Sequence, residues 1–119
     1  MLITDNFSEN GNSKSKREFL QHSVVVHFLY GIEELDPLHN LDTKLNKQIN
    51  DAGVGVYDWH EIAMDSSHGF LFMYGHNAEK LFKTVLPTLK KCPFMKGAVA
   101  HLRFGALDEE GVPEIEVEI

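Results

Sequence analysis

The order in which strand and helix patterns alternate constrains this chain more than any other feature of its sequence. Residues 22–31, HSVVVHFLYG, are rich in β-branched and aromatic side chains and end at a glycine, which is typical of a strand. In the following segment, ELDPLHNLDTKLNKQINDAG, leucine or isoleucine recurs at helical spacing at positions 38, 41, 45 and 49. Asp36 as the N-cap, Pro37 at the first helical position and Gly53 as the stop complete a predicted amphipathic helix.

The second half of the chain repeats this alternation. VGVYDWHEIAMD and FLFMYG, joined by SSHG, predict a hairpin of a second and a third strand. A second helix is expected to begin after the cap residue Asn77, and Pro87 should kink this helix or end it early. The apolar stripe of this helix comprises Ala78, Leu81, Phe82, Val85, Leu86 and Leu89. GAVAHLRFG then predicts a fourth strand, and EIEVEI, after Pro113, a short additional one.

Both halves of the chain therefore contain a strand, a helix and a strand, and FLYG at residues 28–31 is echoed by FMYG at residues 72–75. Over residues 22–105 this order resembles the ferredoxin-like, or split βαβ, fold. The resemblance implies an α+β architecture: an antiparallel βαββαβ sheet with two helices on one face, here with an extra C-terminal strand. It concerns the fold and implies no activity. We expect a single domain over residues 21–119 after a flexible tail of residues 1–20.

Alternation along the predicted strands assigns side chains to the two faces of the sheet. The wholly apolar phases of the first and fourth strands are expected beneath the helices, and the FLYG and FMYG echo extends this phase to the third strand. The open face then carries eight residues, which form the predicted ligand or contact surface: Val25, His27, Leu29, Leu71, Met73, Val99, His101 and Arg103.

An exposed apolar surface of this kind marks a contact site, and homodimers are the commonest soluble oligomers. We therefore expect a homodimer that forms through the open face. Such an assembly resembles the dimeric α+β barrels, in which two sheets face each other and enclose a ligand cavity.

The stretch YDWHE at residues 57–61 leaves its orientation open. In a regular strand Trp59 and Glu61 point to one face while Asp58 and His60 point to the other, and alternation alone does not choose between the two pairs. The phase that includes Asp58 and His60 is the more mixed in polarity. We favour that phase as the open one.

The predicted open face also supplies side chains suited to acid–base catalysis. His27 or His101 beside a carboxylate can transfer protons near neutral pH, and Arg103 can hold an anion. Groupings of this kind are common, however, and the chain has no nucleophile elbow, P-loop or GxGxxG motif. We therefore favour a binding or interaction module. The alternative is a small enzyme, whose weak catalytic candidates are His27, His60, His101 and Asp58.

Seven histidines are many for 119 residues, and histidine is the commonest metal ligand. The nearest metal motif, HExxH, fails because Met64 stands where its second histidine is needed. Cys92 is the single cysteine, so it forms neither an internal disulfide nor a CxxC zinc site. We expect no metal and no cofactor, and a packed or half-exposed thiol at Cys92.

The net charge of −7 repels phosphate backbones, so we expect no nucleic-acid partner. The charge is uneven, because Lys80 to Arg103 contains six bases and no acid while Asp108 to Glu118 contains six acids and no base. Either the acidic end is solvated or lies near the basic segment, or that segment forms a patch for a small anionic ligand. No apolar run approaches the roughly 18 residues of a membrane helix, and no signal peptide is recognisable, so we expect a cytoplasmic location without membrane contact.

Overall fold

The computed structural model describes residues 22–106 and 109–119. The tail predicted for residues 1–20 lies outside these residues. Among the described residues, no helix has the length and apolar character needed to cross a membrane.

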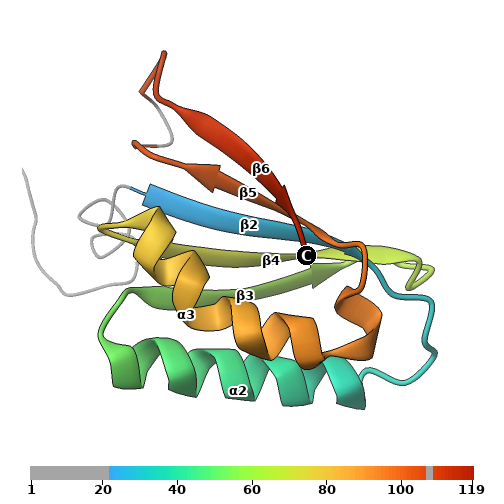
Figure 1. The fold of residues 1–119 in the computed structure, drawn as a ribbon. Helices are drawn as coiled ribbons and strands as arrows, with labels where there is room; N and C mark the ends of the chain where they lie inside the picture. The colour runs from blue at the N-terminus through green and yellow to red at the C-terminus, as the bar shows by residue number, and fades with distance from the viewer. Residues whose placement is uncertain (1–21, 107–108) are drawn as a thin grey trace, which may run out of the picture.

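Five strands form one antiparallel sheet in the order β3-β4-β2-β5-β6. Their bounds are His22–Leu29 for β2, Val56–Ile62 for β3, His68–Gly75 for β4, Val99–Arg103 for β5 and Glu114–Glu118 for β6. Helices α2 (Asp36–Ala52) and α3 (Ala78–Lys91) lie side by side on one face of this sheet (Figure 1). The α+β architecture is compatible with the predicted fold. The order of its strands differs from that of a four-stranded ferredoxin-like sheet, because β6 extends the sheet beyond β5.

Helix α2 forms over the predicted stripe, and Leu38, Leu41, Leu45 and Ile49 are all buried. It ends at Gly53, whose left-handed backbone (φ 66°) lets its N–H reach the carbonyls of Ile49 and Asn50. Asp36 is the first helical residue rather than the predicted cap, since Leu35 occupies the N-cap position. The helix buries a fifth residue beside the stripe, the charged Asp42.

Helix α3 starts at the predicted cap, because the side chain of Asn77 accepts a hydrogen bond of 3.0 Å from the N–H of Lys80. Of the two effects predicted for Pro87, a kink or an early end, the early end is wrong, since the helix continues to Lys91. Pro87 has no N–H to donate to the carbonyl of Lys83, and both residues are exposed. Water can therefore donate the hydrogen bond that this carbonyl does not receive from the helix.

The core lies between the sheet and the two helices. Val24, Val26 and Phe28 of β2 and Ala100 and Leu102 of β5 are buried against them, as the alternation predicted. The partners of β2 across the sheet complete the layer, because Val24 pairs with Met73 and Val26 with Leu71. No described helix covers the opposite face of the sheet (Figure 1).

Candidate functional site

The face of the sheet that points away from the helices carries Val25, His27, Val99, His101 and Arg103, all of them partly exposed. Cross-strand pairing brings these side chains together, because Val25 lies opposite His101 and His27 lies opposite Val99. Leu29, at the end of β2, is 74% exposed. For β2 and β5, the structure therefore places the predicted contact residues on one surface.

The prediction for β4 is wrong. Leu71 and Met73 are fully buried in the core, and Phe70 and Phe72 take their places on the open face. Because FMYG echoes FLYG, the prediction assumed that Phe72 faces the helices as Phe28 does. In the structure Phe28 lies opposite Gly69 in β4, so the residues of β4 that face the helices with Phe28 are those in phase with Gly69 and not with Phe72. A Cβ at Gly69 would lie 2.9 Å from the Phe28 ring, so glycine is needed where that ring crosses β4. Gly69 was the sequence signal for the correct phase.

We call Val25, His27, Phe70, Phe72 and Val99 the open-face patch. The His27 ring stacks on Phe70 with ring centroids 4.8 Å apart, and the Phe70 and Phe72 rings lie 6.1 Å apart. The five side chains occupy the three central strands of the sheet. Four of the five are apolar and three carry aromatic rings, so they form a largely apolar, aromatic surface.

Charged side chains border the open-face patch along β5 and β6. Arg103 Nη1 lies 2.6 Å from Glu114 Oε2, and the Arg103 guanidinium also donates to the carbonyl oxygens of Ala106 and Glu109. His101 Nδ1 lies 3.3 Å from Glu116 Oε2. The acidic C-terminal strand therefore neutralises Arg103, the last base of the basic segment, and Arg103 anchors the connection between β5 and β6.

The four catalytic candidates lie in three different places. His27 is in the open-face patch and His101 is beside it, paired with Glu116. Asp58 is exposed on β3, an edge strand of the described sheet. His60 lies on the helix-facing side of the sheet, where its side chain is 9% exposed.

A β-bulge explains the orientation of YDWHE. The register pairs Tyr57 with Met73 and Trp59 with Phe72, so Asp58 is the extra residue that the bulge inserts between two consecutive positions of β4. At the bulge Trp59 adopts a φ of 121°, which is rare for a residue with a side chain. Tyr57 and His60 consequently both point towards α2. The preference for His60 on the open face is therefore wrong, because the prediction assumed a regular strand.

Tyr57 and His60 converge on Asp42, which has no solvent exposure. The Tyr57 hydroxyl donates to Asp42 Oδ1, and His60 Nδ1 lies 2.7 Å from Asp42 Oδ2. Because a carboxylate accepts hydrogen bonds, Nδ1 of His60 is the donor and carries the proton. Burial, and then the hydrogen bond to Asp42, raise the pKa of Tyr57 far above its ordinary value.

Two further rings surround this buried carboxylate. His39 precedes Asp42 by three residues on α2, and its ring stacks on that of His60 with centroids 5.8 Å apart. The Trp59 ring also stacks on that of His60, with centroids 5.4 Å apart. We call His39, Asp42, Tyr57, Trp59 and His60 the Asp42 cluster. Our sequence reasoning missed it, although an aspartate between Leu41 and Leu45 of an apolar helical stripe was a signal.

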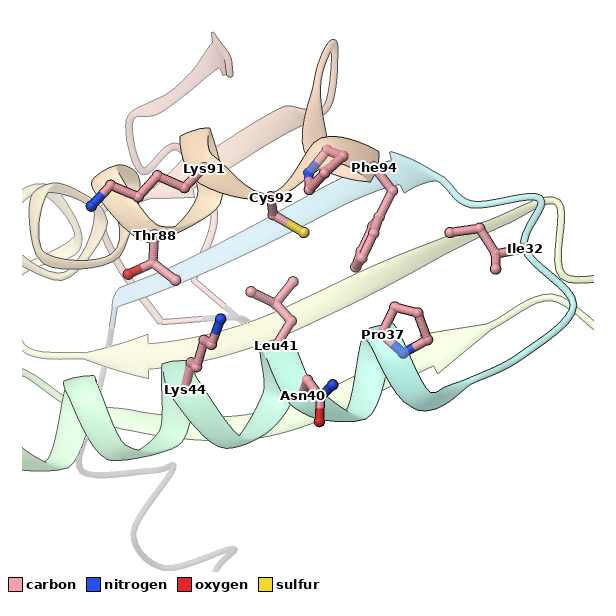
Figure 2. Close-up of a pocket in the computed structure, with 10 residues that line it drawn as sticks. Ile32, Pro37, Asn40, Leu41, Lys44, Thr88, Lys91, Cys92 and Phe94 are labelled. Carbon is pink, nitrogen blue, oxygen red and sulfur yellow. The ribbon is translucent and has the colours of Figure 1, made fainter.

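A pocket of about 720 Å³ opens between α2, α3 and the 3-10 turn η1 (Pro93–Met95). Figure 2 shows Leu41, Phe94 and the Cys92 sulfur turned towards its interior, and Lys44 and Lys91 on the two helices. Nearby, the Thr88 hydroxyl donates to Gln48 Oε1 at 2.8 Å and ties the helices together. Burial raises the pKa of the Cys92 thiol, so Cys92 is a half-buried lining group and not an activated nucleophile.

Comparison of the chain with protein-family models, curated proteins and solved structures found no match.

Proposed function

We propose that the protein is a cytoplasmic binding module with a ferredoxin-like core that pairs with a second copy of itself through the open-face patch. The single observation that carries this proposal is the row of adjoining rings of His27, Phe70 and Phe72 on a sheet face that no described helix covers. Exposed aromatic surface of this kind is costly in water and is stabilised by a partner.

The distribution of charge over the open face resembles that of a protein interface. The open-face patch itself has no carboxylate, lysine or arginine side chain, whereas Arg103 on β5, Glu61 on β3 and Glu114, Glu116 and Glu118 on β6 lie around it. An apolar centre with a charged rim is the usual anatomy of a protein interface. Two such faces can pack against each other as the sheets of a sandwich do, at about 10 Å separation.

Substitution of Phe72 by glutamate tests this pairing. We expect light scattering to give twice the chain mass for the wild type at micromolar concentration, and the single-chain mass for Phe72→Glu. The matched control is Met64→Glu, which makes an apolar side chain acidic in the exposed turn between β3 and β4. The control should remain dimeric. A wild type that is monomeric at every concentration would contradict the proposal and leave the patch free for a different protein.

The pairing is also a premise of the enzymatic alternative. A His, Arg and carboxylate site in a cavity between two sheets requires the sheets to face each other. That alternative therefore stays a prediction, and the mass measurement decides whether its cavity can form.

The pocket between the helices favours a second binding function, for a small anion with an apolar part. Its interior carries Leu41 and Phe94, while Lys44 and Lys91 supply positive charge from opposite helices (Figure 2). We expect decanoate to bind in titration calorimetry, and Lys44→Gln with Lys91→Gln to weaken binding about tenfold or more. The matched control, Lys47→Gln with Lys90→Gln, removes the same charge outside the pocket lining. Equal binding to both double variants would show that the pocket is not the site.

A further inference from the structure

Three side chains of metal-binding type meet where α2 passes the bulged strand β3. His39 and Asp42 come from α2 and His60 comes from β3, and one ligand atom of each lies within 4.8 Å of the other two. Asp42 is fully buried, His60 is nearly so and His39 is exposed. The group therefore has a rigid inner side and an outer ligand that reaches solvent.

Internal hydrogen bonding accounts for only part of this arrangement. Tyr57 and His60 already provide one donor for each oxygen of Asp42, so the buried carboxylate is satisfied without His39. The His39 ring is nevertheless stacked over His60 at an interplanar angle of 30°. A second imidazole at the open side of a buried aspartate and histidine pair is what a metal site needs.

We propose that His39, Asp42 and His60 bind a divalent transition-metal ion of the Zn²⁺ class. Two imidazole nitrogens and one carboxylate oxygen are the ligands that Zn²⁺, Ni²⁺ and Cu²⁺ take from proteins, whereas Mg²⁺ and Ca²⁺ prefer oxygen alone. This assignment replaces the expectation of no metal, which rested on the absence of a local HExxH motif. The ligands here come from two elements that only the fold brings together.

The surroundings of the three ligands fit an ion of this size. Metal–ligand bonds of about 2.0–2.1 Å at tetrahedral angles place ligand atoms roughly 3.3 Å apart. The 2.7 Å contact between His60 Nδ1 and Asp42 Oδ2 must therefore open slightly as the ion replaces the Nδ1 proton, which passes to water. His39, being exposed, can move inwards without disturbing the core.

Tyr57 supports the site from the inner side. Its hydroxyl holds Oδ1 of Asp42 and so leaves Oδ2 directed at His60. Hydrogen bonds of this kind to a ligating carboxylate orient it and strengthen metal binding. On the outer side the exposed position of His39 leaves room for water as a fourth ligand.

The experiment uses the full chain without a histidine tag, freed of metal with a chelator and titrated with Zn²⁺ by calorimetry. We expect one ion per chain and, in His39→Gln, at least tenfold weaker binding. His39→Gln is the informative variant, because an exposed helical residue can be replaced without loss of folding, whereas Asp42→Asn disturbs the core. His76→Gln is the matched control, since it removes an exposed imidazole elsewhere and should bind as the wild type does.

Trp59 provides a second readout that locates the ion. It is the only tryptophan of the chain, and its ring lies 5.4 Å from that of His60. Cu²⁺ should quench its fluorescence with a one-to-one midpoint in the wild type and in His76→Gln, and only at much higher concentration in His39→Gln. Absence of Zn²⁺ binding, or equal binding by His39→Gln and the wild type, would overturn the proposal. Equal weakening in His76→Gln would also overturn it, as it would indicate adventitious binding by surface imidazoles.

Discussion

Asp42 is the residue whose environment departs most from what an amphipathic helix requires. A carboxylate without solvent exposure is tolerated only while hydrogen-bond donors or positive charge compensate its lost hydration. Tyr57 and His60 supply these donors from a strand that is 15 to 18 residues away in the chain. The stability of the helix and the geometry of the bulged strand are therefore linked through one side chain.

Removal of the Tyr57 hydroxyl should expose this dependence. In Tyr57→Phe the Oδ1 atom of Asp42 loses its donor, and we expect the free energy of unfolding to fall by about 1–3 kcal/mol in urea. The matched control is Tyr30→Phe, whose hydroxyl donates to the carbonyl of Glu34 at 2.6 Å in a less buried place. It should cost only about 0.5–1.5 kcal/mol. Equal losses would mean that Asp42 does not depend on Tyr57.

Tyr57 also makes the free energy of unfolding depend on pH in the alkaline range. Because burial raises the pKa of Tyr57 above the ordinary value of 10.0, the unfolded chain loses this proton at a lower pH than the folded protein. The unfolded state then binds fewer protons, so stability falls as pH rises above about 10. Over that range the wild type should lose about 1.4 kcal/mol per pH unit more than Tyr57→Phe. Parallel stability curves would contradict the assignment.

At the scale of elements, β2, β3 and β4 approach one another closely at Gly69. This close approach determines which side chains of β4 face the helices and which lie on the open face. A Cβ at this position would lie 2.6 Å from the backbone oxygen of Glu61 and 2.9 Å from the ring of Phe28. The backbone oxygen cannot move away without breaking the pairing of β3 with β4. Gly69 therefore holds Leu71 and Met73 in the core and Phe70 and Phe72 on the open face.

Gly69→Ala should accordingly weaken the protein through its sheet. We expect a loss of about 1–3 kcal/mol in the free energy of unfolding, because strands must shift to accept the methyl group. Gly97→Ala is the control, since a Cβ there meets nothing within 4 Å and only its backbone, at φ 82°, opposes the change. That control should lose about 1 kcal/mol. Amide exchange across β3 and β4 should increase in Gly69→Ala alone.

At the scale of the whole molecule, the two candidate binding surfaces lie on opposite sides of the sheet. The open-face patch lies on the side that no described helix covers, and the pocket lies between the helices on the other side (Figure 2). Pairing through the patch would bury aromatic surface while leaving the pocket and His39, the exposed member of the Asp42 cluster on α2, accessible. The thermal midpoint of a protein stabilised in this way rises with its concentration, which provides a second check on the predicted homodimer.

The sequence by itself determined the helices and strands of residues 22–119 that the structure describes, and their order. The two helices, the strands and the additional C-terminal strand follow from periodicities of apolar residues within single segments, which are local properties of the chain. The faces of β2 and β5 follow for the same reason, because each has one wholly apolar phase.

Only the tertiary structure decided the phase of β4, the bulge at Asp58 and the meeting of Tyr57 and His60 at Asp42. Each depends on how neighbouring strands register and where a helix crosses them. One extra residue in a strand reverses every side chain after it, and strict alternation cannot anticipate that reversal. The candidate site of this protein is therefore made of residues whose types the sequence displays and whose proximity arises from packing.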